Sequence, residues 1–302
     1  MNDNKRSYEA LSLRKFFDDQ IHHLQQLVDA HFNAYHQKAS LTKEDRQFVE
    51  SFVDAANSKM RAVPGYTHKL REHVRGVYAH VLDIAEQIPP PVELTPTSFR
   101  TDSLINALFV CSEDLDPLLR NNPEVNAYLR SYAKTEVPAM YALLSASKSE
   151  KRTLGIGLQG SMLIREVPQQ VINFSSHKIH TPCRSSEELS KELRKYLFDT
   201  LVALIKREMS DRMNQNSLQT SQASYEERVN SLANPNVYLD TLVEYLESPD
   251  QLLGIEKTHF KLNKMGIKID GNDEQCANEF DIHELTWNGH SRNILLQIAY
   301  AR

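Results

Sequence analysis

The chain has 302 residues, of which 40% are hydrophobic and 25% are charged, values that are typical of a globular protein. Its formal net charge is −5, with −3 carried by residues 1–150 and −2 by residues 151–302. Neither half therefore has the basic field that is typical of proteins that bind nucleic acid or a membrane surface.

The three cysteines, Cys111, Cys183 and Cys276, are odd in number and far apart, which argues against a disulfide scaffold and favours a reducing compartment. The first residues are polar and no apolar stretch follows them, so we expect no secretory signal. The longest nearly apolar stretch, 104–111, is far shorter than the roughly 20 residues of a membrane-spanning helix. We therefore expect a soluble cytoplasmic protein with no membrane partner.

Residues 1–88 are predicted to form three amphipathic helices. In the first, a stripe of apolar residues and His31 between Phe17 and Tyr35 recurs at alternating spacings of four and three, and the third repeats this pattern between Leu70 and Ile88. Narrow stripes of this kind pack against another helix. The second helix has a broader stripe, which ends at Met60. The pattern predicts antiparallel helix hairpins or a bundle, and it is equally compatible with a dimerising coiled coil.

Prolines divide the next part of the chain. Pro89-Pro90-Pro91 and Pro96 predict a semi-rigid connector over residues 89–100, which would separate the first helices from the rest. Residues 101–150 are predicted to form short helices. Together these features predict a domain boundary at the connector.

Residues 151–302 are predicted to form an α+β domain. Apolar and polar residues alternate from Thr153 to Glu166, which indicates a strand, and a turn at 167–169 would lead to a return strand. A long helix follows Ser185, a polar segment at 210–224 is predicted to be a mobile loop, and further helices lead to strands over the last 48 residues. Asn288-Gly289 predicts a tight hairpin between the last two strands. The overall prediction is an α+β fold, in which a helical N-terminal region precedes a mostly antiparallel sheet of about six strands with a helical insertion.

Gly155, Gly157 and Gly160 form a G-x-G-x-x-G hexapeptide, the spacing of a dinucleotide-binding turn. That turn needs a buried strand before it, a helix after it and an acidic residue about 20 positions later. Here a charged segment precedes the glycines, a strand pattern follows them, and serines occupy the acidic position. We therefore interpret the glycines as a bend, a bulge or a place of close approach in a strand, and we predict no nucleotide cofactor.

His177, His180 and Cys183 are the candidate metal ligands, because they bring three side chains that zinc accepts into seven residues. A fourth ligand would have to come from Cys276, His283 or His290. The opposite strand parity of positions 177 and 180 argues against the site, so zinc is kept as an alternative to no cofactor. Cys183 also precedes a helix, where a thiol can become reactive with His180 as its base.

The predicted strands near residue 260 contain four lysines close to an aromatic residue: Lys257, Lys261, Lys264 and Lys268. Such residues can follow a nucleic-acid backbone, but lysines that protect an edge strand from aggregation explain them as well. The acidic chain favours the second interpretation.

The sequence contains no phosphate-binding loop, no G-x-S-x-G turn, no H-E-x-x-H motif and no paired C-x-x-C motif, so no catalytic residue is assigned. This favours a non-enzymatic interaction or regulatory protein, whose N-terminal helices provide self-association or partner docking and whose α+β domain provides a binding surface. The alternatives are an enzyme or a ligand- or metal-binding domain with its site in residues 150–302, and nucleic-acid binding through the lysine-bearing strands. The identity of a partner or small-molecule ligand is left open.

Overall fold

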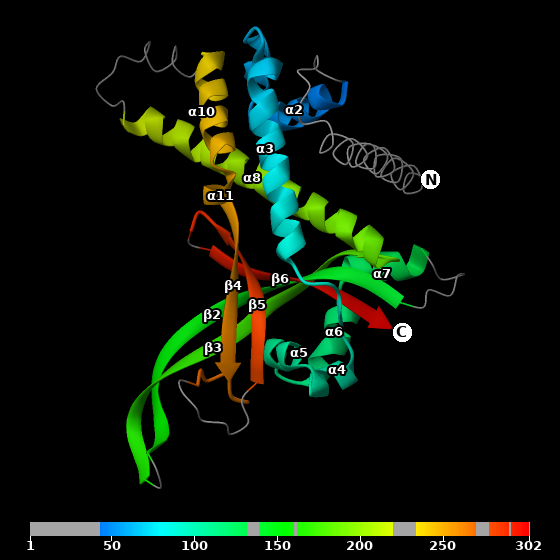
Figure 1. Ribbon diagram of the computed structural model, residues 1–302, viewed down its shortest axis with the longest axis vertical. Coiled ribbons are helices and arrows are strands. Elements are labelled where there is room, and N and C mark those ends of the chain that lie inside the picture. The colour runs from blue at the N-terminus through cyan, green and yellow to red at the C-terminus, as the bar shows by residue number, and fades with distance from the viewer. Residues whose placement is uncertain are drawn as a thin grey trace.

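A computed structural model describes residues 43–131, 139–159, 162–219, 234–269, 278–289 and 291–301 (Figure 1). The helices are α2 (Lys43–Ala56), η1 (Ser58–Ala62), α3 (Tyr66–Gln87), α4 (Pro96–Thr101), α5 (Ser103–Leu108), η2 (Ser112–Asp114), α6 (Leu115–Arg120), α7 (Pro123–Ser131), α8 (Ser186–Gln219), α10 (Pro235–Glu247) and α11 (Pro249–Leu252). The strands are β1 (Val92–Glu93), β2 (Ala139–Gln159), β3 (Met162–Cys183), β4 (Leu253–Leu262), β5 (Asn278–Trp287) and β6 (Ser291–Ala301).

The strands form one curled sheet in the order β3-β2-β6-β5-β4, in which these neighbours are antiparallel and β1 pairs with β6 in parallel. The chain after β4 reaches the opposite edge of the sheet. There Ile172 donates its backbone N–H to the Gly266 carbonyl, and Lys268 donates to the Gln170 carbonyl, both at 2.8 Å. The prediction of a mostly antiparallel sheet of about six strands is confirmed.

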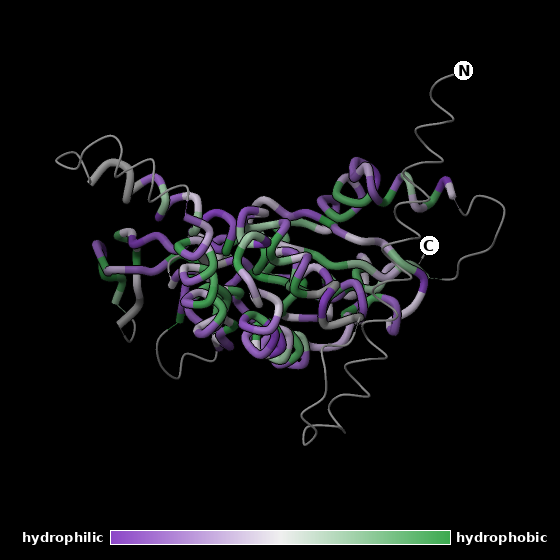
Figure 2. Tube along the Cα trace, turned by 90° about the horizontal axis from the view of Figure 1, so that it is seen from above, coloured by the Kyte–Doolittle hydropathy of each residue, from purple (hydrophilic) through white to green (hydrophobic). Residues whose placement is uncertain are grey.

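Successive side chains of a strand point to opposite faces of the sheet, and a separate hydrophobic core lies on each face. On one face Leu143, Leu285 and Leu295 pack with α2, α3, α8, α10 and α11. On the other face Leu144 and Leu296 pack with the short helices α4 to α7. In Figure 2 the hydrophobic stretches gather in the middle of the molecule, as this layered arrangement requires.

The apolar stripe of α3 is buried as predicted, but its partners belong to the same chain. Leu70, Val74 and Val81 are fully buried in the core that α3 shares with α2, α8 and α10. This stripe is therefore not available as the seam of a coiled coil between two chains. The predicted helix between Phe17 and Tyr35 lies outside the described residues, so a separate N-terminal bundle is not confirmed.

The prediction of short helices up to residue 150 is wrong for its last part, because β2 already begins at Ala139. This segment is rich in alanine and leucine, which favour helices. Both faces of β2 are covered by a core over residues 140–144, so these residues are all apolar and lack the alternation that would have indicated a strand. The predicted boundary at residue 151, between the short helices and the α+β domain, consequently falls in the middle of β2.

The predicted connector at 89–100 is instead fixed to the sheet. Val92 and Glu93 pair with β6, and Gln297 donates its side-chain N–H to the Pro89 carbonyl at 2.9 Å. The next helix, α4, begins at a proline and is capped by the residue before it. The prolines therefore mark a change of direction along the sheet.

The predicted mobile loop at 210–224 is wrong for residues 210–219, which continue α8. The sequence there is polar, but contacts with α10 support the helix. Arg212 forms an ion pair with Glu244 and lies over the ring of Tyr245, and Met213 packs against the core. Residues 220–224 lie outside the described residues.

Asn288 and Gly289 form the predicted hairpin turn between β5 and β6. Both have positive φ, 50° and 65°, which is the conformation that a type I′ turn requires. The predicted turn at 167–169 is wrong, because β3 runs without a break from Met162 to Cys183.

A buried ion pair joins β2 to β5 inside the curl of the sheet. The Lys148 ammonium lies 2.5 Å from a carboxylate oxygen of Glu284, and the two side chains are only 3% and 0% exposed. Thr258 of β4 donates to the other oxygen at 3.2 Å, and the ammonium also lies 5.0 Å from the centre of the Phe260 ring. The carboxylate of Glu284 in β5 therefore links β5 to both β2 and β4.

Replacing Lys148 by methionine is expected to destabilise the protein by about 3–5 kcal/mol, because Glu284 would remain buried without its countercharge. The double variant Lys148→Met/Glu284→Leu should recover most of this loss, since neither charge is then buried. Chemical denaturation followed by circular dichroism measures both effects. Equal losses in the single and double variants would contradict this role for the pair.

Candidate functional site

The hairpin of β2 and β3 projects beyond the rest of the sheet (Figure 1). β6 pairs with β2 only as far as Ser147, whereas β2 and β3 remain paired to Gln159 and Met162. We call residues 149–159 and 162–170 the distal hairpin. Two-stranded ribbons are marginally stable in water on their own, so this one depends on the body of the protein or on a partner.

Apolar side chains are exposed mainly on the distal hairpin. Among the described residues, the strongly exposed large apolar side chains outside it are Val110 and Met265. On the hairpin, the exposed apolar residues and their exposed fractions are Leu154 (65%), Ile156 (62%), Met162 (72%), Leu163 (73%) and Ile164 (37%). A cluster of this kind marks an interaction site more often than scattered apolar residues do.

These apolar residues lie on both faces of the ribbon. Because Ile156 pairs with Arg165, the side chains of Ile156 and Leu163 share a face, and so does that of Leu154. Met162 and Ile164 lie on the other face. Neither face is the polar, solvent-facing side of an ordinary hairpin.

Sequence reasoning missed this site because it placed the turn at 167–169. The available signal was the run of three consecutive apolar residues at 162–164, which no strand with one buried face would require.

The glycines that resemble a nucleotide motif belong to this ribbon. Gly155 and Gly157 lie in β2, and the next element is the antiparallel strand β3, as the strand interpretation predicted. The Val167 side chain lies over Gly157, where an added Cβ would be 3.1 Å from a methyl group. The Gln169 side chain lies over Gly155 in the same way. The two glycines therefore leave room for side chains of β3 that lie across β2. Gly160 lies outside the described residues.

The outer edge of β3 is poorly suited to pairing with another strand. Gln170 and Ile172 already direct backbone groups outward to the segment after β4. Two residues before Gln170, Pro168 has no N–H to donate. Glu166 then forms a bulge with a φ of 61°, which interrupts the register of the ribbon. Prolines and bulges are common protections of an edge strand, so a partner would contact the faces of the hairpin.

Three basic side chains of the hairpin form no ion pair with any described residue: Lys151, Arg152 and Arg165. Glu166 likewise has no ion pair among the described residues, whereas Glu150 lies 2.9 Å from Lys148. These groups therefore give the hairpin a surplus of positive charge on a chain that is acidic overall.

The candidate metal ligands His177 and His180 are divided between the two faces of the sheet. His177 stacks on Phe109 with ring centroids 4.6 Å apart. His180 lies 2.9 Å from the Ser145 hydroxyl and contacts Tyr196, which covers the opposite face. The strand parity that argued against the site therefore holds in the structure.

No three His, Cys, Asp or Glu side chains in the described part of the chain are grouped so as to hold a metal ion. Of the proposed fourth ligands, His283 lies in β5 opposite Lys257 of β4. Cys276 and His290 lie outside the described part. Zinc binding thus stays an untested alternative to the prediction of no cofactor, and elemental analysis of tag-free protein can test it.

Cys183 is a buried thiol with little nucleophilic character. Burial, together with the nearby carboxylates of Glu188 and Glu192, raises its pKa to about 12. The sulfur lies 3.4 Å from the Tyr141 carbonyl. The helix that follows therefore does not produce a reactive thiolate.

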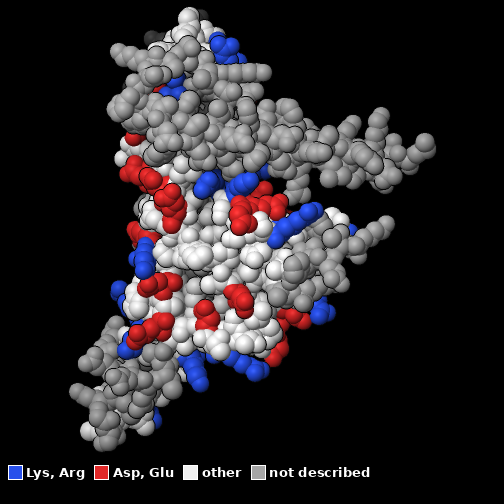
Figure 3. All heavy atoms as spheres, turned by 45° about the vertical axis from the view of Figure 1, so that its right-hand side comes forward, with Lys and Arg blue, Asp and Glu red and all other residues white. Residues whose placement is uncertain are grey.

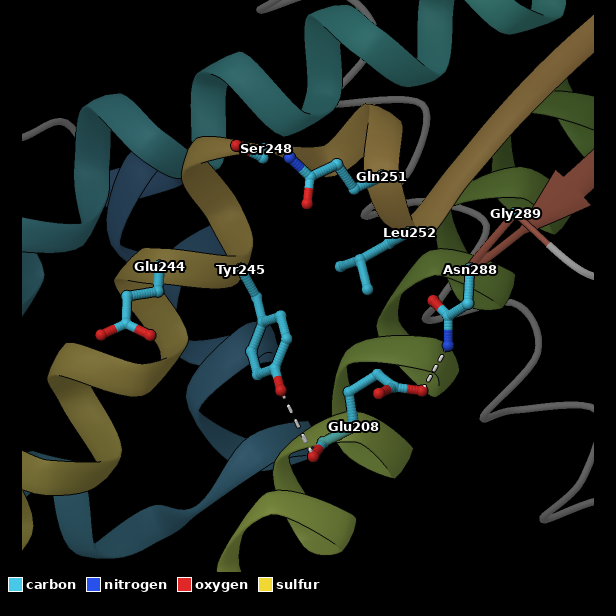
Figure 4. Close-up of a pocket in the computed structure, with 8 residues that line it drawn as sticks. All are labelled: Glu208, Glu244, Tyr245, Ser248, Gln251, Leu252, Asn288 and Gly289. Carbon is cyan, nitrogen blue, oxygen red and sulfur yellow. Dashed lines mark hydrogen bonds between the residues drawn. The ribbon is translucent and has the colours of Figure 1, made fainter.

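A shallow pocket of about 500 Å³ lies between α8, α10, α11 and the β5–β6 turn (Figure 4). Glu208, Glu244 and Tyr245 line it together with the turn residue Asn288. Asn288 donates to the Glu208 carboxylate, and the Tyr245 hydroxyl lies 3.5 Å from the Glu208 carbonyl. Arg207 pairs with Glu208 and Arg212 pairs with Glu244, so both carboxylates of the pocket already have a cationic partner.

The lysines of β4 are paired with acidic residues of β5. Lys257 lies 2.7 Å from Asp281, and Lys261 lies 3.0 Å from Glu279. On the face drawn in Figure 3, acidic and basic side chains are interspersed. This arrangement fits edge-strand lysines better than a track for nucleic acid, which stays an untested alternative.

Comparisons with protein-family models, with curated proteins and with solved structures give no match to this chain. None of the described helices has the length and apolar character needed to cross a membrane.

The burial of His177 predicts a dependence of stability on pH. Burial lowers the pKa of this imidazole in the folded protein, so the unfolded chain binds the proton more readily. The contribution of the neutral ring is therefore complete above about pH 6.5 and is lost as the pH falls below that value. His177→Phe should reduce the loss of unfolding free energy between neutral and mildly acidic pH.

The matched control is His68→Gln, since His68 is exposed on α3. Urea denaturation at a series of pH values measures the difference from the wild type. Parallel curves for the wild type and His177→Phe would contradict the role of the buried ring.

Proposed function

We propose that this chain is a non-enzymatic interaction protein that docks through its distal hairpin. The observation that supports this function is the concentration of exposed apolar side chains on both faces of that hairpin. Exposed apolar surface is unfavourable in water, and its burial against a partner contributes roughly 25 cal/mol per Å².

The body of the protein would hold this element in place. β2 and β3 continue from the hairpin into the sheet, where helices cover both faces. A rigid base reduces the conformational entropy that binding would otherwise remove from the hairpin. Self-association through the N-terminal helices is a separate part of the proposal, and it now concerns residues 1–42, because the stripe of α3 is buried.

Photo-crosslinking in cells tests the docking function. A photoreactive phenylalanine analogue at Leu163 or Ile156 should form adducts, because both side chains would contact the partner. The matched control is the same analogue at Val110, which is 93% exposed but lies far from the hairpin in the sequence. Gel electrophoresis and mass spectrometry detect protein and lipid adducts. Adducts at Val110 but at neither hairpin position would contradict the proposal.

A further inference from the structure

The tip of the distal hairpin is apolar on two sides. Leu163 lies on one face, and Met162 and Ile164 lie on the other, each at the end of the ribbon. A flat protein surface would cover only one of these faces. A lipid interface contacts both at once, and it requires no pairing with the protected edge of β3.

The spacing of the charged groups fits the depth of such an interface. Arg165 lies one to three residues from the apolar residues 162–164, so at about 3.3 Å per residue the tip extends roughly 10 Å beyond it. Interfacial protein segments typically bury their apolar side about 5–10 Å into the boundary between headgroups and acyl chains. The long side chain of Arg165 can then reach the headgroups.

The charges without ion pairs favour anionic lipid. Within the distal hairpin, Lys151, Arg152 and Arg165 outnumber two carboxylates, those of Glu150 and Glu166, by one positive charge. Ile156 pairs with Arg165, and Lys151 and Arg152 lie about four to five residues behind it. They are therefore more than about a Debye length further from the surface than Arg165 and should contribute less.

We infer that the distal hairpin inserts its tip into the interface of a membrane that contains anionic lipid. This inference rests on the proposed docking function and names the partner of the same hairpin. It requires no membrane-spanning segment, but it is contrary to the sequence-based expectation of no membrane partner, which was drawn from the charge of each half of the chain and not from that of the hairpin.

Cosedimentation of the full-length protein with vesicles tests the inference. The protein should bind vesicles of phosphatidylcholine mixed with phosphatidylglycerol more tightly than vesicles of phosphatidylcholine alone, and added salt should weaken the difference. Leu163→Asp should reduce binding at least about tenfold, because it places a charge in the apolar layer. Val110→Asp is the matched control and should leave binding unchanged.

Charge variants test the orientation of the hairpin. Arg165→Gln should weaken binding about fivefold, as expected for a basic group near an anionic surface. Glu166→Gln should strengthen it by a similar factor, and Lys151→Gln should have a smaller effect than Arg165→Gln. Equal effects at Lys151 and Arg165 would overturn the inferred depth.

Tryptophan fluorescence tests whether both faces enter the lipid. In a Trp287→Phe background, Leu163→Trp and Ile164→Trp should each be quenched by brominated lipid, because these positions lie on opposite faces. Quenching at only one of them would overturn insertion of the tip.

The lipid partner and the docking function can fail separately. No vesicle binding combined with a protein adduct at Leu163 would overturn the lipid partner and leave the docking function in place. No adduct and no vesicle binding would contradict both.

Discussion

The ion pair between Lys148 and Glu284 is the buried constraint inside the curled sheet, whose opposite edges are joined by backbone hydrogen bonds between β3 and the segment after β4. The pairing of β6 with β2 stops at Ser147, so the next residue of β2 has no neighbouring strand on that side among those described. Lys148 instead reaches across the inside of the curl to Glu284 and Phe260. Burying two charges is costly, and their attraction offsets the cost only when the geometry is good. The curl and the ion pair therefore depend on one another.

The end of the pairing between β6 and β2 determines where the distal hairpin begins. Up to Ser147, β2 is a central strand with a core on each face, and after Lys148 it is one half of a two-stranded ribbon. Glu150 extends the charged cluster by one step, since it contacts Lys148 and accepts a hydrogen bond from Gln170 of β3 at 2.6 Å. The base of the hairpin is thus held by polar contacts, while its tip is apolar.

Local patterns in the sequence predicted much of the fold. The stripe of α3 and the Asn288-Gly289 turn were predictable because each depends on a few neighbouring residues. The start of β2 was not, because a strand buried on both faces looks like a helix when it is rich in alanine and leucine. The end of α8 was not predictable either, since its support comes from Glu244 and Tyr245 in another helix.

The candidate site was harder to predict than the fold, because it is recognised by the solvent exposure of its apolar side chains. The sequence alone does not show which apolar residues are exposed. Alternation from Thr153 to Glu166 indicated a single strand, but this range holds the end of β2 and the start of β3. A strand with an apolar face normally lies against a core. Here no described element forms a core beneath it, since β6 pairs only with the earlier part of β2 and the helices pack there as well. The same apolar residues that would stabilise a sheet therefore remain exposed, and Pro168 and the Glu166 bulge keep the ribbon from pairing edge to edge. A surface that is apolar on its faces and protected at its edge is suited to contact through side chains, which is why the hairpin is a better candidate for docking than the pocket beside α8.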